Sequence, residues 1–325
     1  MGVEKLPLTD KGAVLSLAYS ERLRLLAIGQ MGDSSGRPYL TLWDPYKRKV
    51  IAVVEKEAYR NIWAICFDYR DKYLVYSDNH HLFRYDISSG EKRVLKIDNG
   101  KIARIVSSKS GPRMIVSGKQ VLVLDIDTEE IIWKLDSYED LAKTDDLEIK
   151  GLPAEWDVPD KLSYFNEPAC IEVFGDGRNV LISGHNKGSI EQIEVDTGKV
   201  VRTLFPAPVQ AAWMSLGCNE TVVAVSSRLP RANFLWELET GQRILPETFN
   251  EQSGSSSCLC LHSKERWLAI GALGGFVSLQ PLDKIELGFS EKLHGERVNQ
   301  VVFGDDAKTF FSAGNDGIVN IIQLT

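Results

Sequence analysis

The feature of this sequence that most constrains its fold is a repeat that runs along the whole chain. Its last copy, Leu293 to Leu324, has three short stretches rich in β-branched and aromatic residues, separated by turns that contain Gly and Asp. This pattern is typical of short antiparallel strands joined by tight turns. The segments 64–97, 173–205 and 260–282 repeat the same order at similar internal distances. The repeat therefore predicts an all-β chain built from similar units.

The number of units follows from a marker at the end of the third strand, where the last apolar position is followed by a polar one. The seven markers are Trp43-Asp44, Tyr85-Asp86, Leu124-Asp125, Ile193-Glu194, Trp236-Glu237, Gln280-Pro281 and Ile322-Gln323. Successive markers are 42, 39, 69, 43, 44 and 42 residues apart, and the long spacing becomes 39 if residues 138–167 are an insertion. A period of roughly 40 to 45 residues is that of a β-propeller blade. The sequence predicts a seven-bladed propeller of four-stranded antiparallel blades.

The predicted blades account for nearly the whole chain as a single domain. Their approximate ranges are 13–56, 60–97, 101–137, 168–205, 208–249, 256–293 and 296–325, the last completed by 3–8. The final repeat ends after its third strand, whereas the segment Val3 to Leu8 alternates like a strand and has Pro7 at a position that an outermost strand tolerates. We expect this N-terminal strand to complete the last blade and close the ring, which leaves no open end.

The repeats resemble those of WD-repeat β-propellers in LWDP at Leu42 to Pro45, LWEL at Leu235 to Leu238, and SAGNDG at Ser312 to Gly317. In that family a His before the first strand, a Ser or Thr on the second, an Asp in the following turn and a Trp on the third form a hydrogen-bonded set. The last repeat has Ile322 at the Trp position. The residues to which the resemblance assigns structural roles are His294, Ser312, Asp316, Trp43, Asp44 and Trp236.

Composition narrows the classes of function and of environment. The net charge is −7, so the chain lacks the basic surface that direct nucleic-acid binding needs. Apolar stretches such as Ile62 to Phe67 are far shorter than the roughly 20 residues that cross a bilayer, and no signal-peptide core is present near the N-terminus. Five cysteines, an odd number, do not indicate a disulfide framework. We expect no membrane insertion and a cytoplasmic location, with the nucleus as the alternative.

In a propeller, the turns between second and third strands and the connections between blades lie on the same face of the ring. The longest connections of this chain are all predicted on that face. They are the loops 30–38 and 227–233 and the insertion 138–167. Repeat proteins often collect insertions on their binding face, although surface loops also lengthen by drift. The insertion has nine acidic residues against three lysines, which favours a protein partner with a basic docking segment. Its candidate contact residues are Trp156, Asp157, Tyr164 and Phe165; alternatively, Trp156 and Tyr164 only hold the loop against the propeller.

A second candidate contact is Trp63, which aligns with Asn299 at the start of an inner strand, where side chains reach the mouth of the channel. A tryptophan in that place is a plausible binding hot spot. Four arginines are predicted on the same face and could hold an acidic peptide or the acidic insertion; the alternative is ordinary solvated charge. They are Arg60, Arg104, Arg228 and Arg231.

Motifs for catalysis or cofactor binding are not found in the sequence. Cys258, Cys260 and His262 alternate along one predicted strand and its turn, without the CxxC pairs typical of zinc sites. No Walker sequence and no GxSxG elbow occurs. We therefore predict no metal, cofactor or catalytic residue, and a non-catalytic protein-interaction scaffold that is a subunit or adaptor of a multiprotein complex. The alternative is a small-ligand-binding or enzymatic propeller with its site at the channel mouth.

Overall fold

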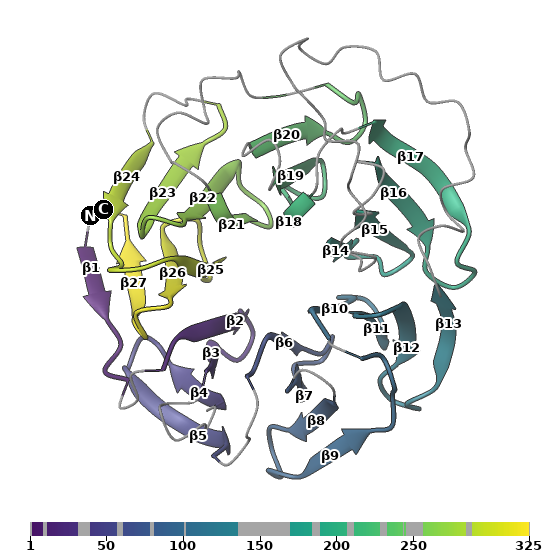
Figure 1. The fold of residues 1–325 in the computed structure, drawn as a ribbon, viewed down its shortest axis with the longest axis horizontal. Helices are drawn as coiled ribbons and strands as arrows, with labels where there is room; N and C mark the ends of the chain where they lie inside the picture. Colours follow the sequence, from purple (N-terminus) through teal and green to yellow (C-terminus); the bar gives the residue numbers. More distant parts are fainter. Residues whose placement is uncertain are drawn as a thin grey trace.

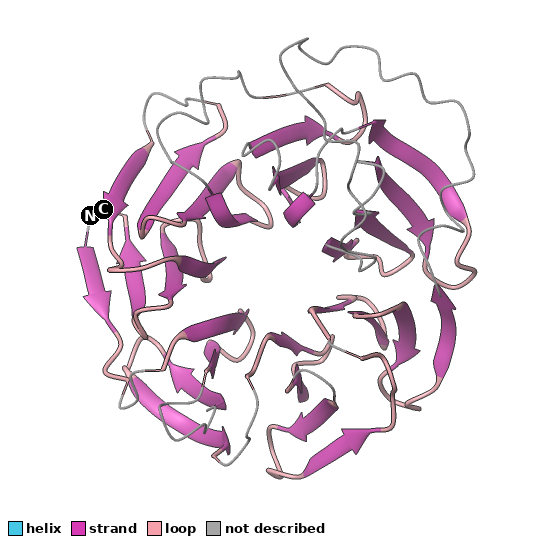
Figure 2. Ribbon diagram, viewed as in Figure 1, coloured by secondary structure: helices cyan, strands magenta, loops and turns pink. Residues whose placement is uncertain are grey.

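The computed structural model describes residues 2–8, 12–31, 40–56, 61–78, 81–100, 102–135, 170–183, 189–206, 211–227, 233–242, 244, 256–283 and 288–324. These residues form antiparallel sheets arranged in a ring (Figure 1). All regular secondary structure among them is β-strand (Figure 2). The structure confirms the predicted seven-bladed β-propeller.

Each blade is a meander that runs from an inner strand to an outer one. The first blade has β2 (Val14–Ser20), β3 (Leu25–Gln30), β4 (Leu40–Asp44) and β5 (Lys49–Glu55). The second has β6 (Ala64–Phe67), β7 (Tyr73–Ser77), β8 (Leu82–Asp86) and β9 (Lys92–Leu95). The third has β10 (Arg104–Ser107), β11 (Arg113–Ser117), β12 (Val121–Asp125) and β13 (Ile131–Leu135). The fourth has β14 (Cys170–Val173), β15 (Asn179–Ser183), β16 (Ser189–Glu194) and β17 (Val200–Pro206).

The remaining three blades follow the same plan. The fifth has β18 (Ala211–Gly217), β19 (Val222–Ser227) and β20 (Asn233–Glu237) within the described residues. The sixth has β21 (Ser256–Leu261), β22 (Trp267–Ala272), β23 (Phe276–Pro281) and β24 (Phe289–Lys292). The seventh has β25 (Val298–Phe303), β26 (Thr309–Gly314) and β27 (Val319–Gln323), completed by β1 (Gly2–Lys5).

The sequence marker at the end of the third strand has a local physical cause. In Asp44, Asp86 and Asp125 the carboxylate oxygen Oδ1 accepts hydrogen bonds of 2.9–3.1 Å from the backbone N–H groups two and three residues further on. These bonds replace strand pairing where the chain reverses, which is the usual role of Asp at the start of a turn. In the second blade Gly90 then adopts a positive φ of 75°, a backbone conformation that glycine tolerates best.

The ring is closed by strand β1, as the sequence predicts. It pairs antiparallel with β27, from Gly2 opposite Gln323 to Lys5 opposite Asn320. The backbone N–H of Leu6 adds a bond of 2.9 Å to the carbonyl of Val319. Pro7 has no N–H to continue the ladder, so the strand is shorter than the predicted segment 3–8. Leu6 is buried in the core between the seventh and first blades, which ties both ends of the chain into one sheet.

Candidate functional site: the central channel and its mouth

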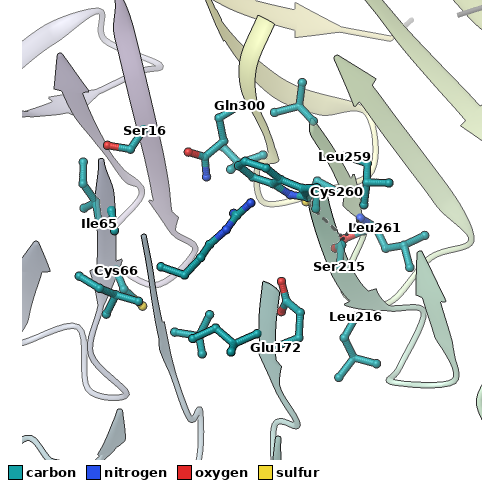
Figure 3. A pocket seen from close by; sticks show the side chains of 18 of the residues that line it. Ser16, Ile65, Cys66, Glu172, Ser215, Leu216, Leu259, Cys260, Leu261 and Gln300 are labelled. Atoms are coloured by element: carbon teal, nitrogen blue, oxygen red, sulfur yellow. Dashed lines mark hydrogen bonds between the residues drawn. The ribbon is translucent and has the colours of Figure 1, made fainter. Parts of the chain in front are cut away.

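The inner strands of all seven blades enclose a channel of about 1530 Å³. Figure 3 shows side chains from several of these strands around the space, among them Ser16, Glu172, Ser215 and Gln300. We call the end of the channel at which the inner strands begin the mouth, and the opposite end the far end. The face of the ring around the mouth is called the mouth face. The antiparallel order places the starts of the first and third strands and the ends of the second and fourth at this face.

Strand register places Trp63 and Asn299 at equivalent positions of the mouth. Trp63 directly precedes Ala64, which pairs with Ser77 on the second strand of its blade. Asn299 directly precedes Gln300, which pairs with Ala313 in the same way. Both Trp63 and Asn299 line the channel. The Nδ2 atom of Asn299 donates to the Val14 carbonyl at 2.7 Å, whereas Trp63 is more exposed and projects an apolar surface at the mouth.

Polar side chains of the inner strands join neighbouring blades to each other. The Gln300 side chain accepts from the backbone N–H of Leu17 and donates to its carbonyl, both at 2.8 Å, across the junction of the seventh and first blades. Ser16 Oγ donates to the Ile62 carbonyl at 2.8 Å. Ser215 Oγ accepts from the Leu261 N–H at 2.9 Å, the dashed line in Figure 3. These bonds fix the spacing of the blades around the channel, and sequence analysis did not single out the side chains that form them.

The most unusual contact in the channel joins two blades that are not neighbours. The Arg104 guanidinium carbon lies 3.2 Å from the ring centroid of Trp213. Arg104 begins strand β10 of the third blade and Trp213 lies on β18 of the fifth, so the pair spans the inner strand of the fourth blade. A cation stacked on an indole face is attracted by the ring quadrupole, more strongly where water is displaced. The contact therefore positions the Arg104 guanidinium inside the channel.

Glu172 lies on that intervening strand, β14, and its carboxylate points into the channel (Figure 3). Burial raises the pKa of Glu172 to about 8, although the positive charges of Arg104 and Lys109 act in the opposite direction. Within the described part of the chain, no hydrogen bond or ion pair compensates the burial of this carboxylate. A carboxyl group with such a pKa is mostly protonated at neutral pH.

The two ends of the channel differ in charge and in apolar exposure. Arg104 and Arg297 line the mouth. At the far end, Lys264 lies 3.9 Å from Glu21, and Glu220 accepts a hydrogen bond from the backbone N–H of Gly175. Large exposed apolar side chains also gather at the mouth, where Met31 is 38%, Trp63 37% and Leu273 43% exposed. The mouth thus combines cations with apolar surface, whereas at the far end Glu21 lies near Lys264 and Glu220 accepts from the backbone.

The structure brings two of the predicted contact residues, Trp63 and Arg104, to the channel. The other predicted contact residues lie outside the described residues: Arg60, Trp156, Asp157, Tyr164, Phe165, Arg228 and Arg231. The insertion 138–167 also lies outside them, but the strand ends that flank it, Leu135 and Cys170, are both at the mouth face. Gln30, expected at the start of a loop, is instead the buried last residue of β3, because its amide donates to the Gly12 carbonyl.

Of the residues assigned structural roles, four are buried and two, Asp44 and Asp316, are partly exposed; the buried ones are His294, Ser312, Trp43 and Trp236. His294 Nδ1 lies 3.0 Å from Asp316 Oδ1, and His294 Nε2 lies 2.8 Å from Ser312 Oγ. Asn320 Nδ2, 3.0 Å from His294 Nε2, adds a fourth member that the sequence did not indicate. Burial lowers the pKa of His294 despite the neighbouring Asp316, so the ring is neutral and fits a tautomer that donates from Nδ1 to Asp316.

The two tryptophans of the sequence markers are buried in hydrophobic clusters between blades. Trp43 donates from Nε1 to Thr41 Oγ1 at 2.9 Å on its own strand, and Trp236 stacks on Phe234 with ring centroids 5.4 Å apart. Neither indole lines the channel.

Cys258 and Cys260 pack in one hydrophobic cluster between the sixth and seventh blades, and His262 lies in the turn that follows β21. The Cys258 thiol is buried beside the Val298 carbonyl. Burial raises the pKa of the Cys258 and Cys260 thiols to about 12. His262 Nδ1 accepts from the backbone N–H groups of Lys264 and Glu265 in the turn after β21. In the part of the chain that the structure describes, no group of three or more His, Cys, Asp or Glu residues is arranged to hold a metal ion.

Comparison with known proteins finds no family model that matches this chain and no curated protein with significant sequence similarity. Across the described ranges, no helix is long and apolar enough to cross a membrane.

Proposed function

We propose that this chain is a WD-repeat propeller that acts as a non-catalytic protein-interaction scaffold, as a subunit or adaptor of a multiprotein complex. The observation that carries the proposal is the concentration of exposed apolar surface and arginine at the mouth. Aromatic residues, Met and Arg are enriched in protein interfaces, where a few of them supply most of the binding energy. The mouth face is therefore the proposed docking surface.

The architecture supports this use because it holds the docking residues in place before binding. Trp63 directly follows Ile62, whose carbonyl accepts a hydrogen bond from Ser16 of the neighbouring first blade. Arg104 is stacked on Trp213. Side chains that are already ordered lose little conformational entropy on association. A rigid ring can therefore present a few anchors with useful affinity.

The acidic insertion 138–167 supplies a further part of the proposed docking surface. Its flanking strand ends lie at the mouth face, and its excess of acidic residues suits a basic segment of a partner protein. Trp156, Tyr164 and Phe165 would provide its apolar anchors.

Two observations support the finer parts of the proposal. The hydrogen-bonded set around His294 has the chemistry of the set found in WD-repeat blades, which favours membership of that family. The five cysteines, all of them among the described residues, form no disulfide bond, which suits a reducing compartment such as the cytoplasm.

Affinity purification from native cell extract with quantitative mass spectrometry tests the scaffold function. The intact protein is compared with a variant whose segment 138–167 is replaced by a Gly/Ser linker, and with Trp156→Ala. A defined set of proteins that copurifies with the intact chain and is lost with the linker variant supports the scaffold and its acidic docking segment. Recovery of no reproducible partner by the intact protein would contradict the scaffold function.

The alternative is a small-ligand-binding or catalytic channel, which the volume of the channel and the perturbed Glu172 favour. Native mass spectrometry of the purified protein separates the two functions. A stoichiometric small molecule that is lost in Glu172→Gln would favour the alternative over the scaffold.

A further inference from the structure

The outer strand of the first blade, β5, differs in charge from the other outer strands. Five of the six outer strands that the structure describes carry an exposed charged residue between their terminal residues. These residues are Glu4 on β1, Arg93 on β9, Lys134 on β13, Arg202 on β17 and Glu291 on β24. A charge in this place opposes association of a sheet edge with another chain. In β5 the residues 50–54 are all apolar, so this obstacle is missing.

Three of these apolar side chains are exposed. Val50 is 37%, Ile51 51% and Val53 43% exposed, whereas Val54 is buried in the cluster between the first and second blades. Because β5 is the edge of its sheet, no described element lies outside it in the ring (Figure 1). Apolar side chains gathered on an accessible surface often mark a site of protein association.

The register of β5 decides what kind of contact a second chain could make. The ladder to β4 skips Ile51 and Val54, which have no partner on that strand. Extra residues of this kind bend a strand and interrupt any ladder that would continue from its edge. A second chain would therefore meet β5 through side chains rather than through regular strand pairing.

The two ends of β5 carry opposite charges. Lys49 at its start is exposed and forms no ion pair with any residue that the structure describes. Glu55 at its end is partly exposed, and Lys92 Nζ and Tyr76 Oη both lie near its Oε2 atom, at 2.7 and 3.2 Å. The Oε1 atom of Glu55 can accept a further donor.

This arrangement makes β5 complementary to a second copy of itself. When two copies run antiparallel about a two-fold axis at Ala52, Lys49 of each lies opposite Glu55 of the other. The exposed Ile51 of each then lies near the exposed Val53 of the other. Opposite charges therefore meet at both ends and apolar side chains meet between them, as a two-fold contact between identical chains requires.

We propose that two copies of this chain associate through the side chains of β5, antiparallel about a two-fold axis at Ala52. The inference goes beyond the scaffold function and does not depend on it, because it concerns the outer side of the ring. A contact built on one strand of seven residues is smaller than the roughly 1,200 Å² at which standard interfaces begin. We therefore expect reversible association with a dissociation constant on the order of 100 µM.

Sedimentation velocity of the purified full-length protein, from about 5 to about 500 µM, tests the proposal. We expect the average mass to rise with concentration from that of one chain toward that of two. Ile51→Lys should weaken association about tenfold or more, because it places a charge against apolar side chains of the second copy. Val201→Lys is the matched control, because Val201 is 55% exposed on the outer strand β17, and it should associate like the unmodified chain.

Three results would overturn the proposal. The first is a single-chain mass at every concentration. The second is association that Ile51→Lys leaves unchanged. The third is equal weakening by Ile51→Lys and Val201→Lys, which would remove the assignment to β5.

A change of charge tests the antiparallel arrangement separately. Lys49→Glu places like charges opposite each other at both ends of the contact and should weaken association severalfold. Lys199→Glu is its control, because Lys199 is also exposed, directly precedes Val200 of β17, and changes the net charge equally. Circular dichroism confirms that all variants are folded. Equal association of the Lys49→Glu and Lys199→Glu variants would overturn the pairing of Lys49 with Glu55.

A different protein is the competing occupant of β5. If the unmodified chain keeps a single-chain mass while Ile51→Lys loses a protein that the intact chain recovers from cell extract, that protein occupies β5 and the second copy is overturned. Self-association through β5 without any recovered partner would support this inference and contradict the scaffold function, so the two can fail separately.

Discussion

The raised pKa of Glu172 leads us to expect that this residue contributes to the pH dependence of stability. Its pKa in the folded chain is about 8, well above the ordinary carboxyl value of 4.5, because of burial. Between these values the folded state keeps a proton that the unfolded state has lost, so unfolding becomes easier as pH rises from about 4.5 to about 8. We expect Glu172→Gln to raise the unfolding midpoint at pH 8 and to change it little at pH 5. Thermal denaturation measures both.

Exposed Glu291 provides the matched control for this experiment. Glu291→Gln should shift the midpoint equally at both pH values. If the midpoint of Glu172→Gln followed pH as that of the unmodified chain does, the carboxyl group in the channel would not be the one that titrates.

The buried set around His294 gives a second expectation for single residues. Ser312→Ala removes a partner 2.8 Å from His294 Nε2 in a site closed to water. Loss of a buried hydrogen-bond partner costs about 1–3 kcal/mol, and a single domain of 325 residues loses about 1.5 °C in midpoint for each kcal/mol. Differential scanning calorimetry should therefore show a fall of about 1.5–4.5 °C. Ser89→Ala, in an exposed turn, should leave the midpoint nearly unchanged.

Part of the candidate site was accessible from the sequence at the level of residues. The alignment of repeats placed Trp63 beside Asn299, and strand register agrees. Strand register in the structure also puts Arg104 and Trp213 at one position of their strands, opposite Ser117 and Ser226, which the sequence analysis did not predict. The sequence could not show that the Arg104 side chain reaches Trp213 past the inner strand of the fourth blade, because that depends on the diameter of the ring. The raised pKa of Glu172 depends likewise on surroundings drawn from several blades.

Strand β1 is the element on which ring closure depends. Removal of residues 1–9 would expose the edge of β27 and uncover the core that Leu6 helps to fill. We expect a sharp fall in unfolding midpoint, together with association of chains through the newly exposed strand edge. Thermal denaturation and light scattering measure the two effects. Lys5→Gln, which keeps the strand, is the control, and an unchanged midpoint after truncation would show that β1 contributes little.

The elements were largely predictable because each repeat carries its own turn chemistry. Asp86 and Asp125 stop the third strand through side-chain bonds to the following turn, so their spacing counts blades without reference to the core. Exact strand ends were less predictable. Gln30 extends β3 because its side-chain amide donates a hydrogen bond to the Gly12 carbonyl. Pro7 shortens the N-terminal strand.

At the scale of the whole molecule, stability depends on where the ring is joined. The seventh blade contains both ends of the chain, so backbone pairing between β1 and β27 holds the ring shut. At the junction between the second and third blades, each blade is built from consecutive strands of the chain, and no strand is shared between them. The contacts there are those of side chains such as Ala64 and Val75 with Ile105 and Met114. A ring opened there would have to close by side-chain packing and by side-chain bonds such as that from Arg84 to the Ile126 carbonyl, without strand pairing.

A circular permutant tests this difference. A short linker joins Thr325 to Met1, and new ends are placed at Asn99–Gly100, between β9 and β10. Each blade of the permutant is then formed by one continuous stretch of sequence. No strand from one end of the permuted chain pairs with the blade at its other end, so the new ends separate at a lower cost in free energy. We expect the same circular dichroism spectrum with a lower and broader thermal transition. A permutant as stable as the natural chain would mean that packing between blades, rather than the shared blade, keeps the ring closed.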